Sequence, residues 1–352
     1  MKTNRRNFLK AIPLAGLSFG AVFSESINPA SVIADSLNVN ESENPTLRFQ
    51  QNGQFKIMQF TDLHLEFTDE AGMKGAQRTL DLIKSLLVEE KPDLTIWTGD
   101  IIWIQPTGLK GGVSEAWEKA TALFAELQLP FAITFGNHDH ERSESAKDML
   151  KMIQRNPYNL TYNADEKLPG AGNCVLPIWG SQEKKAKWNI YLFDSLAYAP
   201  KSIGGYDWIK NDQIQWYRNE SQRRTSENGG TPLPALAFFH IPLPEYHIVR
   251  QQEDCHGYRD EEVCSPEINS GLFTSFIEMG DVMGVFVGHD HNNDYCGNHK
   301  GIMLAYGRKS GFQCYGDLEK GGRIITLYED ERRFNTNVRI PGQKLFEKDF
   351  QG

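Results

Sequence analysis

The amino-acid sequence predicts a layered α/β fold, in which β-strands and α-helices alternate along the chain. Short apolar runs typical of buried strands recur between segments whose apolar residues have helical spacing. The alternation is clearest over residues 55–135, where strand, helix, strand, helix and strand follow one another. The composition, with 39% hydrophobic and 24% charged residues, is that of a soluble globular protein.

The elements of the first half are placed by their apolar spacing and by the residues that end them. Residues 47–62 are typical of a hairpin that turns at Asn52-Gly53, and Pro92 ends the first helix. The predicted strands of this half are residues 55–60, 94–98 and 131–135, and the predicted helices are residues 77–90 and 114–127.

The second half of the chain contains two long irregular stretches, at residues 156–188 and 242–270. Helical spacing predicts one further helix over residues 207–224. Apolar runs bounded by turn residues predict the remaining strands, at residues 189–194, 236–240, 282–287, 302–306, 323–328 and 334–340.

Polar groups suited to metal binding follow five of the predicted strands. In a layered α/β fold the carboxyl ends of neighbouring strands meet in one crevice, so residues far apart in the sequence can share it. Carboxylates, an amide oxygen and imidazoles together fit two first-row divalent or trivalent ions. The candidate ligands are Asp62, His64, Asp100, Asn137, His240, His289 and His291.

A pair of metal ions would give this site its chemistry. Two ions about 4 Å apart can hold a phosphate and generate hydroxide from a bound water. Because the ions bring more positive charge than the two aspartates remove, we expect a cationic pocket in a protein whose formal charge is -9. That net charge disfavours nucleic acid as a partner, and the expected substrate is a phosphorylated small molecule.

The tetrad Gly136-Asn137-His138-Asp139 directly follows the predicted strand at residues 131–135. Its glycine lets the backbone turn sharply at the end of the strand. The ring of His138 can ligate a metal or move a proton, and Asp139 is placed to hold that ring in one tautomer. We therefore expect His138 and Asp139 to be the catalytic residues.

The motifs taken together resemble a known family. They span residues 62–291, and the flanking stretches at residues 238–245 and 288–297 resemble its small purple-acid-phosphatase-like branch. The resemblance implies an αββα sandwich, with two mixed β-sheets flanked by helices. Five blocks of the calcineurin-like metallophosphoesterase superfamily are matched, in order, by Asp62-x-His64, Gly99-Asp100, Gly136-Asn137-His138-Asp139, His240 and Gly288-His289-x-His291.

The resemblance also implies a role for each residue. Asp100 would bridge both metal ions, and His138 would stabilise the transition state or protonate the leaving oxygen. The expected reaction is hydrolysis of phosphomonoesters by attack of a metal-bound hydroxide. The implied ligands are Asp62, His64 and His291 for the first ion, and Asn137, His240 and His289 for the second.

One departure from the resemblance concerns the identity of the metal. Purple acid phosphatases place an iron-binding tyrosine three residues after the bridging aspartate, where this chain has Trp103. Tryptophan cannot ligate in that way, so the colour of a ferric tyrosinate is not expected. Manganese, iron and zinc all stay candidates.

Two alternative functions stay open. A phosphodiesterase or a nucleotide pyrophosphatase can use the same site, and residues 156–188 and 242–270 would decide between these activities. The other alternative is a non-catalytic protein that binds metal or phosphate. The presence of all expected ligands together with His138 argues against this second alternative.

Several other residues are expected to lie outside the site. Lack of CxxC spacing disfavours a cysteine zinc site, and Cys255 with Cys264 is the pair expected to form a disulfide. We expect solvent-exposed side chains at His140, His247, His256 and His299. We expect a solvated turn at Arg308 and Lys309.

Residues 1–35 resemble a twin-arginine export signal rather than an uncleaved membrane anchor. Arg5 and Arg6 precede an apolar stretch that is short for a membrane span, and residues 32–34 are typical of a cleavage site. We expect twin-arginine export machinery as a partner, a periplasmic or secreted location, and no stable membrane association after cleavage. A linker at residues 36–46 and a single catalytic domain at residues 47–352 would follow.

Overall fold

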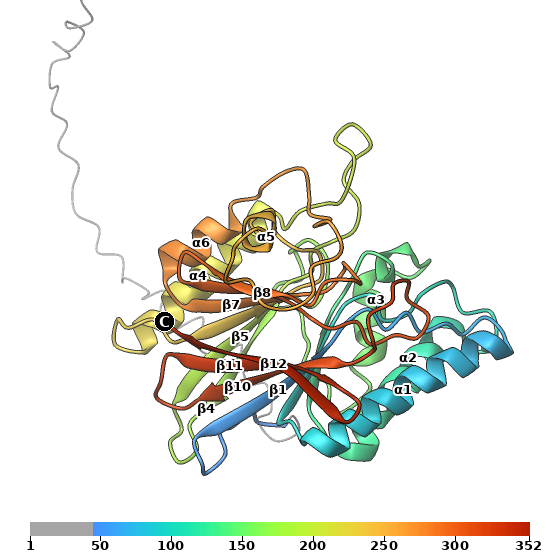
Figure 1. Cartoon of the computed structure of the whole chain (residues 1–352), viewed down its shortest axis with the longest axis horizontal. Coiled ribbons are helices and arrows are strands. Elements are labelled where there is room, and N and C mark those ends of the chain that lie inside the picture. Colours follow the sequence, from blue (N-terminus) through green and yellow to red (C-terminus); the bar gives the residue numbers. More distant parts are fainter. Residues whose placement is uncertain (1–44) are drawn as a thin grey trace, which may run out of the picture. The chain divides into compact units, whose positions relative to one another are not determined.

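The computed structural model describes residues 45–352, and within them it contains two six-stranded β-sheets (Figure 1). The sheets pack face to face and helices cover their outer faces, which gives four layers. The predicted αββα sandwich is therefore confirmed. The predicted export signal at residues 1–35 and most of the linker lie outside the described residues.

The first sheet consists of β1 (Gln54–Phe60), β2 (Leu94–Thr98), β3 (Phe131–Thr134), β10 (Gly322–Tyr328), β11 (Arg333–Ile340) and β12 (Gln343–Gln351). β1, β2 and β3 pair in parallel, and β10, β11 and β12 extend the sheet antiparallel from β1. The strand order is β12-β11-β10-β1-β2-β3. The parallel strands therefore end at the same edge of this sheet.

The second sheet consists of β4 (Cys174–Trp179), β5 (Ala186–Leu192), β6 (Ala235–Phe238), β7 (Val282–Val287), β8 (Cys296–His299) and β9 (Ile302–Tyr306). β5, β6, β7 and β9 are parallel neighbours, while β4 and β8 lie antiparallel at the two edges. The strand order is β4-β5-β6-β7-β9-β8. The strands that precede the candidate ligands are thus interior and parallel in this sheet.

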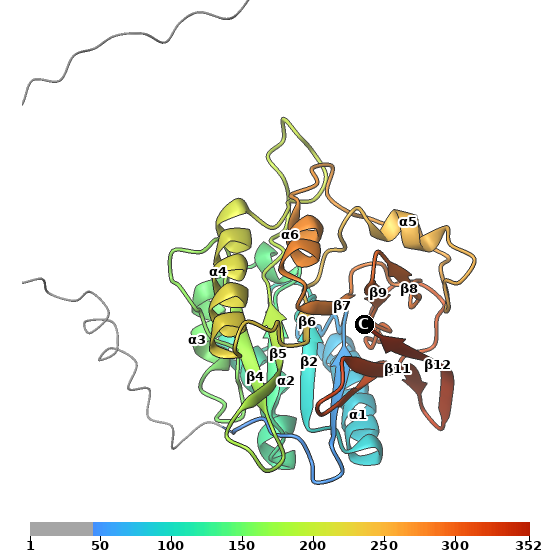
Figure 2. The same ribbon diagram turned by 90° about the vertical axis from the view of Figure 1, so that its left-hand side faces the viewer.

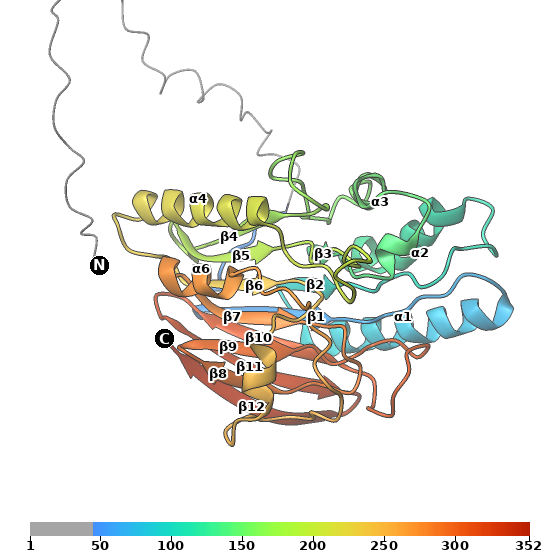
Figure 3. The same ribbon diagram turned by 90° about the horizontal axis from the view of Figure 1, so that it is seen from above.

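The helices form two groups on opposite sides of the paired sheets (Figures 1 and 3). One group packs on the first sheet: α1 (Glu70–Glu90), α2 (Gly112–Leu127) and α3 (Ala146–Ile153). The other packs on the second sheet: α4 (Asn211–Glu227), α5 (Tyr246–Arg250) and α6 (Leu272–Met279). Figure 2 shows α4 lying along β4 and β5.

Apolar side chains occupy both faces of the inner strands. On β1, Ile57 packs between the two sheets, whereas Met58 and Phe60 pack against the first group of helices. On β5, Ile190 packs between the sheets and Tyr191 packs beneath α4. Successive side chains of a strand point to opposite faces, and a strand covered on both sides is therefore apolar throughout, which is why these strands could be predicted.

The predicted hairpin over residues 47–62 is wrong, although its turn forms. The backbone N–H of Gly53 donates to the carbonyl of Gln50 (2.9 Å), as a tight turn requires. Arg48, which precedes the turn, instead forms a parallel β-bridge with Trp179 of β4. Leu47 and Phe49 are buried in the layer between the sheets, and burying them there stabilises this arrangement.

Several short elements were not predicted. β4 and α5 lie within the two stretches that were expected to be irregular, and α3, α6, β8 and β12 were also missed. Most are eight residues or shorter, and β12 is largely exposed, so their apolar periodicity is weak. None of the helices in residues 45–352 has the length and apolar character that a membrane span requires.

The predicted disulfide between Cys255 and Cys264 is wrong, because both cysteines are free thiols. Cys255 is buried next to His256, which pairs with Cys296 at the start of β8. The thiol of Cys264 instead faces the carbonyl of Glu262 (3.7 Å). The two side chains therefore have different surroundings, although the loop between them is short.

Candidate metal centre

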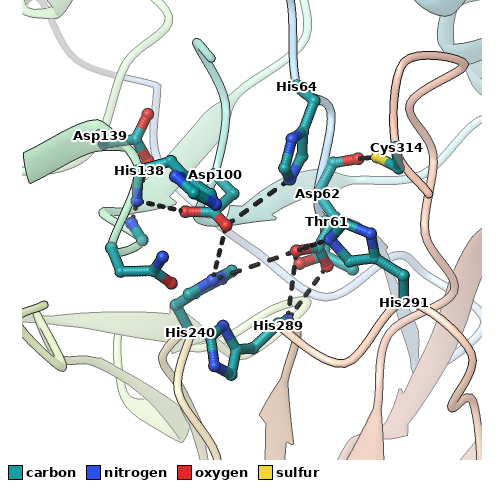
Figure 4. A network of polar contacts seen from close by, with 12 residues as sticks. Thr61, Asp62, His64, Asp100, His138, Asp139, His240, His289, His291 and Cys314 are labelled. Atoms are coloured by element: carbon teal, nitrogen blue, oxygen red, sulfur yellow. Dashed lines mark hydrogen bonds and ion pairs between the residues drawn. The ribbon is translucent and has the colours of Figure 1, made fainter. Parts of the chain in front are cut away.

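The carboxyl ends of five parallel strands, three from the first sheet and two from the second, meet at one site (Figure 4). Asn137 lies between Gly136 and His138, which both contact Asp100. The structure therefore brings together all the predicted ligands, which are Asp62 and His64 after β1, Asp100 after β2, Asn137 after β3, His240 after β6, and His289 and His291 after β7.

Four of these residues have a left-handed backbone, which non-glycine residues rarely adopt. The φ angles are 52° at Asp62, 46° at His64, 50° at Asp100 and 81° at His289. Each such residue costs on the order of 1–3 kcal/mol, and such strain is concentrated at functional sites. The strand ends are therefore bent in a way that local backbone preference alone would not produce.

Two glycines allow the strand ends to approach one another closely. A Cβ atom on Gly99 would lie 2.6 Å from Nδ1 of His240, and φ of Gly99 is +81°. A Cβ atom on Gly136 would overlap the carboxylate of Asp100. Any larger residue at either position would push apart the loops that carry the candidate ligands.

The two aspartates occupy the middle of the cluster. Oδ2 of Asp100 lies 3.2 Å from Nε2 of His240 and 3.6 Å from Nε2 of His64, so one carboxylate oxygen is shared by residues from both sheets. Oδ1 of Asp62 lies 3.3 Å from Nε2 of His291. These separations suit atoms that surround a common cation.

Five of the seven candidate ligands present a buried polar atom that has no hydrogen-bond partner. Their side chains are almost completely inaccessible, with no residue of the seven above 7% exposure. A buried polar atom without a partner is costly, and a cation in the cluster would supply the missing partner of those atoms that face it. The site thus fits metal ions, and the unpartnered atoms are Nε2 of His64, Oδ1 of Asn137, Nε2 of His240, Nε2 of His289 and Nδ1 of His291.

Hydrogen bonds on the far side of the ligands orient them. Nδ1 of His240 donates to the carbonyl of Thr98 (2.7 Å), which directs Nε2 toward Asp100, where loss of its proton would free a lone pair for a cation. The backbone N–H of His289 donates to the carboxylate of Asp62 (3.1 Å), and that of His138 donates to Asp100 (2.9 Å). The donor atoms are therefore held in position before any metal binds.

The charges of the cluster follow from this packing. Burial raises the pKa of Asp62 and Asp100, but the adjacent imidazoles outweigh it, so the pKa of Asp62 falls to about 2 and that of Asp100 lies well below its usual value. Burial lowers the pKa of His240, but Asp100 and Asp62 raise it to about 10. Burial and the neighbouring His240 lower the pKa of His289 to about 3. The metal-free site therefore contains two carboxylates and a protonated His240.

His138 lies at the mouth of the cluster, and its ring contacts Glu141 rather than Asp139. Nδ1 of His138 lies 3.0 Å from Oε2 of Glu141, and 29% of the His138 side chain is exposed. The other carboxylate oxygen of Glu141 accepts a hydrogen bond from the hydroxyl of Tyr198 (2.6 Å). That hydroxyl also accepts from Nδ2 of Asn137 (3.4 Å).

The prediction that Asp139 holds the His138 ring is wrong. Both carboxylate oxygens of Asp139 accept backbone N–H groups, from Gly136 (2.9 Å) and from Ile101 and Ile102 (3.1 Å each). Burial, reinforced by the charge of nearby Asp100, raises its pKa to about 6. Asp139 therefore connects the turn after β3 to the loop after β2, and its carboxylate is occupied by backbone N–H groups rather than by the His138 ring.

Several residues around the site could not be found from motifs. Glu141 and Tyr198 contact His138 and Asn137, as described above, and Tyr206 meets the ring of His289 edge-on (centroids 4.3 Å apart). Tyr315 stacks on His291 (4.0 Å). Apart from Glu141, which follows the tetrad directly, these side chains come from irregular loops, where no periodicity indicates their direction.

Three residues expected in solvent are buried or paired instead. Nε2 of His140 lies 2.9 Å from the buried carboxylate of Asp194. Arg308 pairs with Asp294 (2.5 Å), and Nζ of Lys309 donates to the carbonyl of Tyr315 (2.6 Å), so the predicted solvated turn at these two residues is wrong.

The remaining histidines lie away from the site. His247 and His256 are exposed, as predicted. His299 is partly buried against the ring of Phe273 (centroids 5.1 Å apart), so the expectation of full exposure is wrong there. None of these rings contacts a candidate ligand within the contacts that the described residues make.

We expect metal uptake by the metal-free protein to depend on pH through His240. Its ring, whose pKa is about 10, must lose a proton before Nε2 can bind a cation. Metal affinity should therefore rise by about tenfold per pH unit through the neutral range, with release of about one proton per cation at this position. Calorimetric titration with zinc in buffers of different ionisation enthalpy measures both quantities, and an affinity independent of pH would contradict the assignment.

Comparison with known proteins agrees with this geometry. The family model for calcineurin-like phosphoesterases matches residues 55–293, which include every candidate ligand. Two Arabidopsis thaliana proteins named probable inactive purple acid phosphatase 14 and 29 are 33% and 34% identical. The alignments cover 79% and 82% of this chain, and 76% and 80% of those proteins.

A solved structure shows the same fold. It is a dimetal phosphatase from Danio rerio, with a TM-score of 0.58 and 12% identity, and the match covers 84% of this chain and 98% of that one. The fold, the converging donors and the family match lead to one assignment. The chain belongs to the calcineurin-like phosphoesterase family.

Proposed function

We propose that residues 47–352 form a phosphatase that hydrolyses phosphomonoesters at a pair of metal ions. The observation that carries the proposal is the gathering of four histidines and Asn137 around two buried aspartates, with unpartnered buried atoms among their side chains. Donors of this kind, oxygen and imidazole nitrogen, suit manganese, iron or zinc. When bound, two such ions polarise the phosphoryl group and activate water.

The positions of the side chains support a division of the donors into two sets. Asp100 lies between them, because its Oδ2 is near His64 on one side and His240 on the other. We assign the bridging role to this carboxylate. The proposed ligands are Asp62, His64 and His291 for one ion, and Asn137, His240 and His289 for the other.

The surroundings of His138 support a role in proton transfer. Its side chain is 29% exposed, whereas the candidate ligands are buried, so it is the cluster histidine that an entering phosphoester can reach. Glu141 accepts from Nδ1 and thereby holds the ring in place, and Nε2 carries a proton to donate when the ring is in its protonated form. In this position His138 can protonate the leaving oxygen or stabilise charge on the phosphoryl group.

The names of the two plant relatives describe those proteins as probably inactive, so activity must be tested directly. The completeness of the cluster in this chain favours catalysis, because each proposed ligand is present and oriented. A protein that only bound metal or phosphate would not need a proton-transfer group at the entrance of the site.

The experiment is a phosphoester panel with elemental analysis. Purified protein is stripped with a chelator, reloaded separately with manganese, zinc and iron, and assayed on a nitrophenyl monoester and diester. We expect about two ions per chain and cleavage of the monoester, which the chelator abolishes. Cleavage of the diester alone would identify a phosphodiesterase. Two bound ions without any hydrolysis would favour a binding protein.

The His138→Ala variant separates proton transfer from metal binding. We expect it to keep both ions but to lose about 10²–10⁴-fold in kcat, because the leaving oxygen is no longer protonated. Glu141→Gln should cause a smaller loss, since the ring stays in place. His247→Ala, which changes an exposed histidine outside the site, is the control. Loss of an ion from His138→Ala would instead identify His138 as a ligand.

We further propose that the protein is exported by twin-arginine machinery and acts in the periplasm or outside the cell. The support is the sequence of residues 1–35, with Arg5 and Arg6 ahead of an apolar stretch. Replacing both arginines by lysine should retain the protein in the cytoplasm with its signal uncleaved. Unchanged export of this variant, measured by cell fractionation, would exclude the proposed route.

A further inference from the structure

Cys314 lies beside the candidate metal centre, although it belongs to no family motif. It is part of the loop of residues 307–321 between β9 and β10. Its thiol Sγ lies 2.7 Å from the carbonyl oxygen of Asp62, so the loop passes directly over the turn after β1 (Figure 4). A cysteine ligand was not expected, because the cysteines lack CxxC spacing. The sequence alone also does not show which loop returns to this site.

The sulfur belongs to a group of three potential ligands. The ligand atoms of Cys314, His64 and His291 all lie within 4.8 Å of one another. Nε2 of His64 is buried and has no hydrogen-bond partner, and Nε2 of His291 lies 3.3 Å from Oδ1 of Asp62. Ligands of a four-coordinate ion, at bond lengths of about 2.0–2.3 Å, lie roughly 3.3–3.8 Å apart, which is compatible with this group. The two imidazoles therefore leave room for an ion that the sulfur can also reach.

The loop holds Cys314 in place from both sides. Before it, the side chain of Gln313 donates to Glu66 (2.7 Å). After it, the ring of Tyr315 stacks on His291, and its backbone carbonyl accepts from Lys309 (2.6 Å). Since the neighbours on each side are anchored, the thiol is positioned by the fold rather than by a freely moving loop.

We propose that the thiolate of Cys314 is a ligand of the first metal ion, together with Asp62, His64 and His291. This inference rests on the proposed dimetal site. On binding, the thiol gives its proton to solvent and the sulfur exchanges its hydrogen bond to Asp62 for a bond to the ion. The Asp62 carbonyl keeps the hydrogen bond from the N–H of Gly311 (3.0 Å).

The proposal narrows the choice of metal. Thiolate ligands select zinc over manganese, which prefers oxygen donors. In the second set, His240 and His289 have ligand atoms within 4.8 Å of one of Asp100, and this group contains no sulfur. The ligands of the two metal positions would therefore differ in softness. Zinc would be favoured at the position that includes Cys314.

The test uses cobalt as a spectroscopic probe. Metal-free protein is loaded with Co²⁺, and the near-ultraviolet absorption of a sulfur-to-cobalt charge transfer is recorded for the wild type, Cys314→Ala and Cys264→Ala. We expect the band in the wild type, its loss in Cys314→Ala and its retention in Cys264→Ala. Zinc affinity of the first position should fall by about 10–100-fold in Cys314→Ala, with manganese little changed.

Alkylation of the unmodified chain gives a second measurement that needs no variant. Iodoacetamide should modify Cys314 in the metal-free protein and react at least about tenfold more slowly after zinc loading, because a metal-bound thiolate is protected. Cys264, which is also half-buried, serves as the internal control and should react at similar rates in both states. Mass spectrometry of the cysteine-containing peptides reports both rates.

The outcomes separate this inference from the proposed function. Two bound cobalt ions and phosphoester hydrolysis without the band would overturn the role of Cys314 and leave the phosphatase intact. Loss of the band in Cys264→Ala alone would place the sulfur ligand near Glu261 and Asp290, and would also overturn it. Failure to bind two ions at all would refute both proposals.

Discussion

The candidate site depends on the mutual compensation of buried charges. Asp62 and Asp100 are almost fully removed from water, and a buried carboxylate without a partner costs several kcal/mol. In the metal-free protein the positive ring of His240 offsets part of this charge. Metal ions would complete the compensation and would satisfy the unpartnered atoms of the surrounding ligands. Placing these charges together requires a left-handed backbone at four of the ligands and glycines beside them.

The sequence was sufficient to predict the layers of the fold and the meeting of the strand ends. Strands covered on both faces must be apolar throughout, so residues such as Leu94–Thr98 and Val282–Val287 were found with their observed limits. Polar residues that directly follow such strands must lie at the edge where the carboxyl ends of the parallel strands meet. The position of the candidate ligands therefore followed from topology, without knowledge of any contact.

The loops could not be predicted in the same way, because their direction is decided by contacts between distant segments. Adjacency in sequence suggested that Asp139 would orient His138, but the turn after β3 directs Asp139 toward the backbone and brings Glu141 to the ring. Two strands, β8 and β9, and their loops separate Cys314 from His291 in the sequence, so spacing gave no sign of their proximity. Pairing of Arg308 with Asp294 was hidden for the same reason.

The guanidinium group of Arg323 on β10 links the two sheets from within. It is fully buried and donates to the carbonyls of Tyr306 (2.7 Å) and Asp294 (2.5 Å) and to the hydroxyl of Thr336 (3.0 Å). Asp294 lies only a few residues after the last candidate ligand. A fragment that ended soon after His291 would thus contain every ligand yet lack the anchor of the loop that carries two of them. The terminal strands contribute no donor atom, but the shape of the centre requires them.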